Sequence, residues 1–370
     1  MQLLDERGTR FHASGGKVDS KQAVFYNPAM LHNRDISVLV LKALIGLKRI
    51  RTPMRISLPL EASGIRGIRL WKEFPDSITS LRMNDGSPAA ADAMKKNLVL
   101  NGITDARVTV HNEEASRFLL DNPAGYVDVD PFGFPGPFLD AALRSISRDG
   151  ILAVTATDTA ALCGTAPGAC LRKYWSVPMR NWLMHEAGLR ILSRKVQLVA
   201  SQHDRGAFPL YSYAERHYMR AYFSVRKGRS HADRALARHG SLFSCPKCLR
   251  FLASGEPDTR SCHGAMRRAG PMDMGPLWDR ELAERVSSIN GWKDLDRLVG
   301  VVAEESAVNA VGFHDLHALV KAHGLKVIPR SSAVLSALRK AGHEASQTHF
   351  TGKGIRTTAP LEEVLQALRA

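Results

Sequence analysis

The chain has 370 residues, 44% of them hydrophobic, enough for two or three domains with proper cores. No run of about 18 apolar residues is present, and residues 1–10 are charged where a signal peptide needs an apolar stretch, so we expect a cytoplasmic protein. The 51 Lys and Arg against 36 Asp and Glu give a net charge of +15, shared between both halves of the chain. A polyanion is therefore the first partner to consider, and a basic surface used only for solubility is the alternative.

The first part of the sequence alternates short apolar runs with helical patterns. Ser87 is a plausible N-cap, followed by Pro88 at the first helical position and Asn101-Gly102 as a stop signal. Strands are predicted at residues 55–61, 77–83, 106–110, 125–129, 150–156 and 218–225, and helices at 65–74, 87–101, 137–146 and 177–200. This alternation is typical of an α/β fold with a mostly parallel, doubly wound sheet.

A basic segment, Arg226-Lys227-Gly228-Arg229, marks the predicted domain boundary, because the alternation is lost beyond it. We expect residues 1–227 to form one domain and residues 228–370 a smaller α+β domain. Within the second domain, residues 243–280 are rich in Cys, Pro and Gly. Residues 310–324 and 331–342 are predicted helices, and the hairpin that follows them makes residues 310–360 resemble a winged helix.

The loop Glu61-Ala62-Ser63-Gly64-Ile65-Arg66-Gly67 joins the first predicted strand to its helix, with glycines where the backbone must turn tightly or approach a ligand. Asp85 follows about 20 residues later at the end of the next strand, where an acid can accept hydrogen bonds from ribose hydroxyls. The pair predicts a nucleoside site. The spacing does not separate a dinucleotide from S-adenosylmethionine, and the loop alone could be an ordinary tight turn.

The stretch Asp128-Val129-Asp130-Pro131-Phe132-Gly133-Phe134 runs from an apolar strand into an acid, a proline and two aromatics. Pro131 removes a backbone donor and stops the strand, so Asp130 is expected to face a pocket. A carboxylate beside Phe132 and Phe134 suits an amino group on a flat heterocycle. Enzymes that methylate amines place a similar acid-Pro-aromatic turn at this strand, which favours a methyltransferase. The alternative is a plain turn with both phenylalanines in the core.

Several motifs occur in the same order as in the tRNA (guanine-26 N2) dimethyltransferases, and the chain resembles the archaeal members of that family from about Lys21 to Thr357. The motifs are Val24-Phe25-Tyr26-Asn27-Pro28, Asn33-Arg34-Asp35, Gly64-Ile65-Arg66-Gly67, Asp130-Pro131-Phe132-Gly133, His185-Glu186-Ala187-Gly188-Leu189-Arg190 and Thr348-His349-Phe350. The resemblance implies a Rossmann-like methyltransferase domain. It also implies transfer of methyl groups from S-adenosylmethionine to the exocyclic N2 of guanine 26 in tRNA, giving N2-methyl- and N2,N2-dimethylguanine.

The resemblance also implies roles for single residues. Asp130, Pro131 and Phe132 would be catalytic, with Asp130 and the Pro131 carbonyl orienting the amine and Phe132 stacking on the guanine. Phe25 and Tyr26 would cover the site. Contacts to the cofactor would come from Arg34, Arg66, Asp85, Glu114 and Ala115. The second domain would hold the tRNA through cations that face phosphate, namely Lys321, Lys326, Arg330, Arg339, Lys340, Lys353 and Arg356. No membrane and no protein partner are implied.

Cys245-Pro246-Lys247-Cys248 is half of a zinc ribbon, and the second Cys pair that is frequent in the family is replaced here by Cys262-His263-Gly264. Cys245, Cys248, Cys262 and His263 could form a tetrahedral zinc site, although adjacent ligands strain such geometry. A metal-free knuckle is the alternative.

Three departures from the family pattern keep other functions open. Pro59 lies within the first predicted strand, and Glu61 and Glu114 stand where aspartate is more usual. The alternatives are a methyltransferase acting on another exocyclic amine, in a different RNA guanine, in DNA or in a protein amide, and a non-enzymatic RNA-binding protein with a decayed cofactor site.

Overall fold

A computed structural model describes residues 1–15, 22–253 and 262–369. Contacts divide the chain into two compact units. Unit 1 contains Met1–Thr157, Val199–Phe208 and Tyr222–Asp233, and unit 2 contains Asp158–Leu198, Pro209–Ala221 and Arg234–Ala370. No helix among the described residues combines the length and the apolar character needed to cross a membrane.

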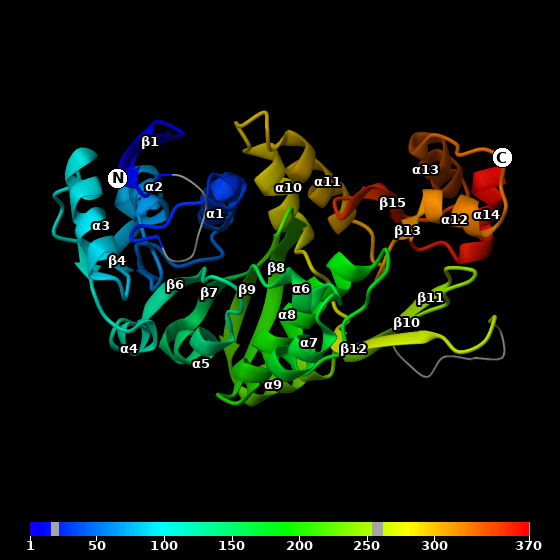
Figure 1. Cartoon of the computed structure of the whole chain (residues 1–370), viewed down its shortest axis with the longest axis horizontal. Coiled ribbons are helices and arrows are strands. Elements are labelled where there is room, and N and C mark those ends of the chain that lie inside the picture. Colours follow the sequence, from blue (N-terminus) through cyan, green and yellow to red (C-terminus); the bar gives the residue numbers. More distant parts are fainter. Residues whose placement is uncertain (16–21, 254–261, 370) are drawn as a thin grey trace. The chain divides into compact units, whose positions relative to one another are not determined.

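Unit 1 begins with a hairpin and continues as alternating strands and helices (Figure 1). Its strands are β1 (Gln2–Glu6), β2 (Thr9–Ala13), β3 (Met54–Leu58), β4 (Ile78–Asn84), β5 (Val108–His111), β6 (Ala124–Val129) and β7 (Ile146–Ala156). Its helices are η1 (Pro28–Met30), α1 (Leu31–Gly46), α2 (Ile65–Glu73), η2 (Pro75–Ser77), α3 (Pro88–Leu100), α4 (Ala115–Asp121) and α5 (Gly136–Ser145).

A seven-stranded sheet, in the order β5-β4-β3-β6-β7-β9-β8, is the centre of the fold. The pairs β3·β4, β3·β6, β4·β5 and β6·β7 are parallel. The last two strands, β8 (Arg205–Glu215) and β9 (Tyr218–Lys227), follow each other with only two residues between them and make the sheet a mixed one. Because β3 to β7 run in parallel, their carboxyl ends lie along one edge, where ligands bind in open α/β sheets.

Helix α3 shows how local sequence fixes this part of the fold. The Ser87 side chain accepts a hydrogen bond from the backbone N–H of Ala90, Pro88 opens the helix and Asn101 caps its end, as predicted. The residue after the cap, Gly102, has a φ of +68°, which favours glycine over residues with a Cβ.

The sequence prediction was wrong at several edges of the fold. Strand β8 was not predicted, because Gly206 and Pro209 weaken the strand pattern; proline is tolerated here since β8 is the outermost strand. The hairpin β1·β2 was also missed. Strand β3 ends at Leu58, so Pro59 lies just beyond the strand and does not interrupt it.

Unit 2 contains most of the remaining elements. Its helices are α6 (Thr159–Leu162), α7 (Pro167–Tyr174), α8 (Met184–Ser201), α10 (Arg280–Ser288), α11 (Asp296–Ser306), α12 (Leu316–Ala322), α13 (Ser331–Lys340) and α14 (Leu361–Arg369), and α9 (Arg229–Leu236) is shared with unit 1. Its own strands are β10 (His239–Ser244), β11 (Phe251–Ala253), β12 (Arg267–Asp273), β13 (His314–Asp315), β14 (Ala345–Thr348) and β15 (Thr351–Thr357). The predicted helix at 177–200 begins seven residues late, at Met184, because Val177 pairs with Gly270 as an isolated β-bridge.

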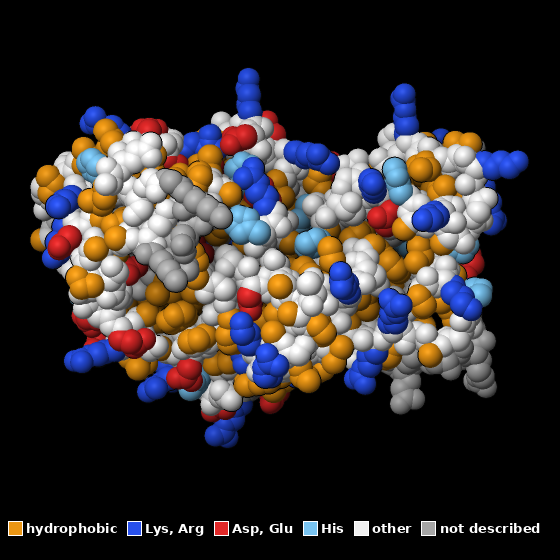
Figure 2. Space-filling model, in the orientation of Figure 1, with side chains coloured by type: hydrophobic (Ala, Val, Ile, Leu, Met, Phe, Trp, Pro, Cys, Tyr) orange, Lys and Arg blue, Asp and Glu red, His pale blue; other side chains and the backbone are white. Residues whose placement is uncertain are grey.

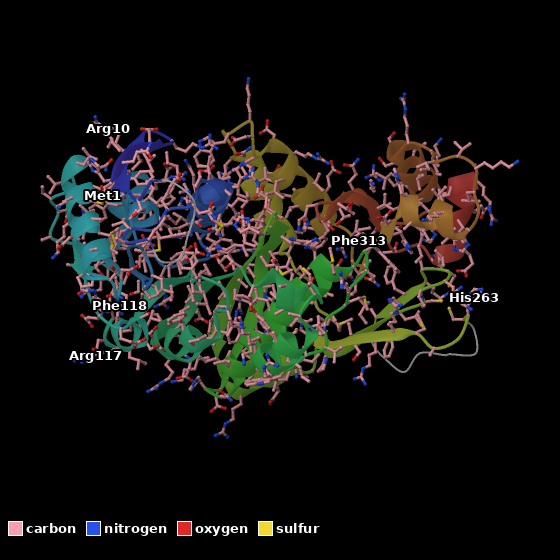
Figure 3. All side chains as sticks on the ribbon, viewed as in Figure 1. Met1, Arg10, Arg117, Phe118, His263 and Phe313 are labelled. Atoms are coloured by element: carbon pink, nitrogen blue, oxygen red, sulfur yellow. The ribbon has the colours of Figure 1, made fainter. Side chains whose placement is uncertain are left out.

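Two small antiparallel sheets organise unit 2, in the orders β11-β10-β12 and β13-β15-β14. Apolar side chains from α12, α13 and α14 form a core beneath the second sheet. Phe313 lies just before β13 (Figure 3). Its ring stacks on that of Phe350 with centroids 5.6 Å apart.

Candidate active site

Five parallel strands end at the same edge of the sheet, and the predicted catalytic and cofactor residues of unit 1, except Arg34 of α1, follow four of these ends. Glu61 to Gly67 follows β3, Asp85 follows β4, Glu114 follows β5 and Asp130 follows β6. The structure therefore brings together the loop, the acids and the turn that the sequence singled out.

The loop after β3 needs glycine for two reasons. Gly64 has a φ of +79°, and a Cβ built on it would lie 2.7 Å from the Met83 side chain. A Cβ on Gly67 would lie 2.8 Å from the sulfur of the same methionine. Close packing of α2 on β4 thus explains both glycines, and it brings the backbone of the loop to the edge of the sheet.

Asp85 ties the loop to the start of α3. One carboxylate oxygen accepts the N–H of Ala62 at 2.9 Å, and the other accepts the N–H of Ser87 at 2.9 Å. Each carboxylate oxygen has more than one lone pair, so the group can still accept bonds from hydroxyls.

Glu114 is the N-cap of α4, and Ala115 is the first, buried residue of that helix. The Glu114 carboxylate accepts the N–H groups of Ser116 and Arg117, each at 2.9 Å, and these bonds lower its pKa. Behind the cap, Phe118 of α4 is fully buried, with its ring 5.2 Å from that of His111 (Figure 3). The acid predicted to border adenine is therefore held by the helix that follows it.

Asn84 is a buried residue at the end of β4 that sequence reasoning did not single out. Its amide donates to the carbonyls of Pro59 and Glu113, at 3.0 and 3.1 Å, and its oxygen accepts the N–H of Glu113 at 2.9 Å. Asn84 thus fastens the ends of three neighbouring strands. The sequence signal for this residue is the Asn84-Asp85 pair at a strand end, from which only Asp85 was predicted to belong to the site.

Arg66 lies at the centre of the acidic strand ends and is 6% exposed. Its guanidinium donates to Ser37 Oγ at 2.7 Å, to Asn33 Oδ1 at 2.8 Å and to the Asp130 carboxylate. A second acid, Asp128, lies 3.4 Å from the same group. Arg66 therefore connects the cofactor loop to the Asp130 turn, and Asn33 and Ser37 of α1 are supporting residues that the sequence did not assign.

Glu61 closes the same cluster from the end of β3. Its carboxylate accepts the N–H of Gly67 at 3.0 Å and lies 3.9 Å from Arg66. Burial raises the pKa of Glu61 to about 8, with Arg66 acting in the opposite direction. Glutamate at this position thus fits its surroundings as a buried acceptor.

Arg34 is buried against the N-terminal hairpin. Its guanidinium donates to the Glu6 carboxylate at 2.9 and 2.5 Å and contacts the carbonyl of Asn27 at 3.3 Å. Burial acts to raise the pKa of Glu6, but Arg34 and Arg69 hold it below its ordinary value. The cofactor contact of Arg34 stays a prediction, and the structure shows its guanidinium bound to Glu6.

The turn after β6 is fixed to the end of β7. The N–H of Gly133, which has a φ of +72°, donates to Thr157 Oγ1 at 2.6 Å, and the N–H of Thr157 donates to the Gly133 carbonyl at 3.0 Å. Pro131 is buried, the Asp130 side chain is 17% exposed and Phe132 is 50% exposed. A half-exposed phenylalanine thus stands beside the carboxylate.

The predicted aromatic cover is present in part. The rings of Phe25 and Phe132 meet edge to face, with centroids 4.1 Å apart. Tyr26 instead packs against Phe11 of the hairpin and donates to Glu6 at 3.0 Å. Phe134 turns towards the start of α5, where a Cβ on Gly136 would overlap its ring.

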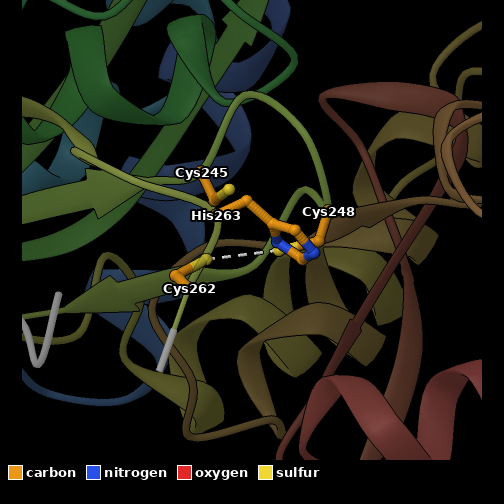
Figure 4. A group of neighbouring side chains, drawn as sticks. All are labelled: Cys245, Cys248, Cys262 and His263. Carbon is orange, nitrogen blue, oxygen red and sulfur yellow. Dashed lines mark hydrogen bonds between the residues drawn. The ribbon is translucent and has the colours of Figure 1, made fainter. Parts of the chain in front are cut away.

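Unit 2 contains the four predicted metal ligands, and their ligand atoms all lie within 4.8 Å of one another (Figure 4). Cys245 and Cys248 lie between β10 and β11, and Cys262 and His263 precede β12. The Cys248 and Cys262 sulfurs are 3.4 Å apart. Zinc bound at about 2.3 Å by thiolates in a tetrahedron needs spacings of this size, so the cluster could hold the ion.

The family motif of α8 meets Arg356 elsewhere in unit 2. Glu186 of α8 accepts bonds from Arg190 and from Arg356 of β15, at 2.9 and 2.6 Å. Arg356 is fully buried, so the prediction that it faces phosphate was wrong. The other six cations of that prediction are exposed.

Comparison with known proteins places this geometry in a family. The sequence pattern of the N2,N2-dimethylguanosine tRNA methyltransferases matches residues 6–369. The chain is 35% identical over 366 residues to the tRNA (guanine(26)-N(2)/guanine(27)-N(2))-dimethyltransferase of Aquifex aeolicus, covering 95% of this chain and 91% of that protein. It is 36% identical over 369 residues to the tRNA (guanine(26)-N(2))-dimethyltransferase of Pyrococcus furiosus, covering 94% and 92%.

A solved structure agrees over the full length. The complex of Trm1 from Pyrococcus horikoshii with S-adenosyl-L-methionine is 32% identical in sequence, has a TM-score of 0.87 and covers 100% of both chains. The chain therefore belongs to the N2,N2-dimethylguanosine tRNA methyltransferase family.

Proposed function

We infer that this chain transfers methyl groups from S-adenosylmethionine to the exocyclic N2 of guanine 26 in tRNA, producing N2-methyl- and N2,N2-dimethylguanine. The observation that carries the inference is the Asp130-Pro131-Phe132 turn at the carboxyl edge of the sheet, in a chain that matches the family from residue 6 to residue 369. The turn places an acid, a carbonyl and an exposed aromatic ring next to the glycine loop.

We propose that Asp130 and the Pro131 carbonyl orient the two N–H bonds of the guanine amine. The N2 lone pair is delocalised into the base, so the amine becomes nucleophilic only as it pyramidalises and loses a proton. Asp130 can accept that proton. The ion pair with Arg66 fixes the carboxylate in place, and most of the remaining rate enhancement comes from alignment of the reacting atoms.

We propose that Phe132 stacks on the guanine and that Phe25 supports it. The base must leave the tRNA stack, at a cost of a few kcal/mol, and stacking on an aromatic ring offsets part of that cost. Phe132 is half-exposed and its edge-to-face contact with Phe25 limits its movement.

The cofactor residues are proposed from the chemistry of the sheet edge. Asp85 offers carboxylate oxygens for ribose hydroxyls, Glu114 and Ala115 would border adenine, and Arg66 and Arg34 would contact the methionine end. Bound S-adenosylmethionine supplies the electrophilic methyl group. Calorimetry with the cofactor should show binding by the wild type and weaker binding by Asp85→Asn. Unchanged binding would remove Asp85 from the site.

We propose that residues 228–370 grip the tRNA and that residues 310–360 act as a winged-helix-like part. The order β13, α12, α13, β14, β15 and the hairpin β14·β15 support this proposal. The exposed cations of this segment are Lys321, Lys326, Arg330, Arg339, Lys340 and Lys353. Figure 2 shows Lys and Arg side chains spread across the face it draws, and tRNA affinity should therefore fall steeply with salt. A tRNA substrate also makes the cytoplasm the expected location of this protein.

We propose that Cys245, Cys248, Cys262 and His263 bind one zinc ion with a structural role. The ring of His323, the residue that follows α12, contacts the Cys248 carbonyl at 3.0 Å, so an ordered knuckle would support the end of that helix. Metal analysis should find about one zinc per chain in the wild type and less in Cys248→Ser. No zinc in freshly purified wild type would favour the metal-free knuckle.

The decisive experiment incubates the protein with methyl-labelled S-adenosylmethionine and an unmodified tRNA transcript, then maps the label by nuclease digestion and mass spectrometry. Label at N2 of guanine 26 is expected. A guanine-26-to-adenine transcript is the matched control and should lose the label. Label that persists in the control would identify another target.

A further inference from the structure

Trp175, at the end of α7 in unit 2, is a large aromatic residue with half of its surface exposed. Its φ of +56° and ψ of +41° lie in the left-handed region, which bulky residues rarely adopt. Such conformations persist only where the surrounding structure enforces them, and they occur frequently at functional sites.

The backbone around Trp175 is held on both sides. Its N–H donates to the Leu171 carbonyl at 3.1 Å, and its carbonyl accepts Arg194 Nη1 at 3.1 Å. The next residue, Ser176, donates to the Pro271 carbonyl at 2.9 Å. Val177 exchanges backbone hydrogen bonds of 3.0 and 2.8 Å with Gly270. The indole is therefore presented on a fixed backbone, with little ordering left to occur on binding.

One cation lies over the ring, and two residues close to Trp175 in the chain are exposed and apolar. Lys195 Nζ lies 3.1 Å from the ring centroid and covers one face, while Lys195 itself is 6% exposed. Leu171, four residues before Trp175, and Val177, two residues after it, are 56% and 48% exposed. Trp175 thus remains half-exposed in a segment that also exposes two other apolar residues. We call Leu171, Trp175, Val177 and the neighbouring exposed cations Arg172 and Lys173 the Trp175 surface.

The charge around this surface indicates what it binds. Residues 158–203 contain six Lys and Arg and two acids, of which Glu186 is buried against Arg190 and Asp158 pairs with Lys173 at 3.6 Å. Arg172 and Lys173, on the last turn of α7, are exposed. An apolar ring within a basic surface suits a ligand that combines flat bases with phosphates.

We propose that the Trp175 surface is a second contact for the substrate tRNA, in which an unpaired base stacks on the exposed part of the Trp175 ring and the exposed cations Arg172 and Lys173 meet its phosphates. This inference rests on the proposed function for the identity of the RNA, and it names a contact outside the strand-end site. Stacking of one base contributes about five- to hundredfold to affinity.

The test substitution is one that the left-handed backbone of residue 175 accommodates, so the variant protein should fold. Trp175→Gly removes the ring and suits that backbone better than tryptophan does, so it should fold at least as well. Its dissociation constant for unmodified tRNA transcript, measured by filter binding at fixed salt, should rise about five- to hundredfold. Its kcat at saturating tRNA and its affinity for S-adenosylmethionine should match the wild type. Trp175→Tyr should restore most of the tRNA affinity, and Val99→Ala, at an exposed apolar residue of α3 outside this surface, is the control for loss of exposed apolar area, with a change below about twofold.

Wild-type tRNA affinity in Trp175→Gly would overturn the proposal. If that result came with a change from dimer to monomer in sedimentation, a second copy of the chain would be the occupant instead. The experiment distinguishes a failure of the Trp175 surface from a failure of the proposed methylation of guanine 26. Weakened RNA binding by Trp175→Gly in a protein that leaves guanine 26 unmethylated would support the Trp175 surface and contradict the proposed function.

Discussion

The guanidinium of Arg66 and the carboxylate of Asp130 form an ion pair that joins the start of α2 to the end of β6. Arg66 also donates to Asn33 and Ser37, so the pair is anchored on α1 as well. The residue proposed to take the proton is thus oriented by the helix that follows the cofactor loop. This ion pair connects the glycine loop and the Asp130 turn, which were predicted separately from the sequence.

Asp130→Asn keeps the shape of the side chain but removes its capacity to accept a proton. We expect kcat to fall about 10²- to 10⁴-fold, the usual contribution of a general base, while S-adenosylmethionine binding stays near wild type. Single-turnover methylation of the tRNA transcript and calorimetry measure the two quantities. Asp121→Asn, at the exposed end of α4, is the matched control and should be fully active. Near-normal turnover of Asp130→Asn would exclude the proposed role.

Arg66→Met removes the cation that neutralises Asp128 and Asp130. Breaking a buried pair leaves uncompensated charge, so the free energy of unfolding should fall by about 3–5 kcal/mol. Chemical denaturation provides the measurement. In the double variant Arg66→Met/Asp130→Asn the loss should be smaller than the sum of the two single losses, because one of the stranded carboxylates is gone. Strict additivity would argue that the pair contributes nothing to stability.

Phe132→Ala should lower kcat/KM for tRNA about five- to hundredfold, because the extruded guanine loses its stacking partner. Phe132→Trp should retain most of the activity. Methylation rates at subsaturating tRNA measure the effect. Equal activity of the alanine and tryptophan variants would assign Phe132 to packing on Phe25 alone.

Features of the structure that depend on residues close together in the sequence, such as the limits of a helix, were predicted well. Ser87, Pro88 and Asn101 mark the limits of α3 in the sequence, and the structure uses them as the cap, first turn and end of that helix. The order of strand ends likewise followed from the parallel pattern, which placed Asp85, Glu114 and Asp130 at one edge. Partners distant in sequence could not be predicted in this way. The contact of Arg34 with Glu6 depends on the unpredicted hairpin β1·β2, and the burial of Arg356 depends on Glu186, 170 residues away.

Ser87→Ala tests the cap of α3. The Ser87 hydroxyl satisfies the N–H of Ala90, and its loss should reduce the free energy of unfolding by about 1 kcal/mol. Ser87→Asp should recover the lost stability, because aspartate caps equally well and suits the positive end of the helix. Thermal or urea unfolding of the three proteins gives the comparison. A destabilised Ser87→Asp variant would show that the hydroxyl acts through another contact.

Glu305 of α11 predicts an acid-sensitive step in the unfolding of unit 2. Its carboxylate accepts bonds from Arg356 at 2.9 Å, from the Thr348 hydroxyl at 2.5 Å and from His349 Nδ1 at 2.6 Å. Burial acts to raise the pKa of Glu305, but Arg356 and His349 lower it from 4.5 to about 2. The folded state therefore binds fewer protons than the unfolded state between these values.

The sign of the pH dependence follows from that difference. The stabilisation is complete above about pH 4.5 and is lost as the pH falls towards 2, so the free energy of unfolding should decrease across this window. Glu305→Gln should flatten the decrease and also destabilise the protein at neutral pH, by about 3–5 kcal/mol, because Arg356 then lacks one of its buried partners. Glu304→Gln changes the exposed neighbour and is the matched control. Burial also lowers the pKa of His314 from 6.5 to about 4. The contribution of this histidine to the free energy of unfolding is lost in a higher window, as the pH falls from about 6.5 to 4, so its effect is separable. An unchanged slope below pH 4 in Glu305→Gln would show that other carboxylates carry the acid sensitivity.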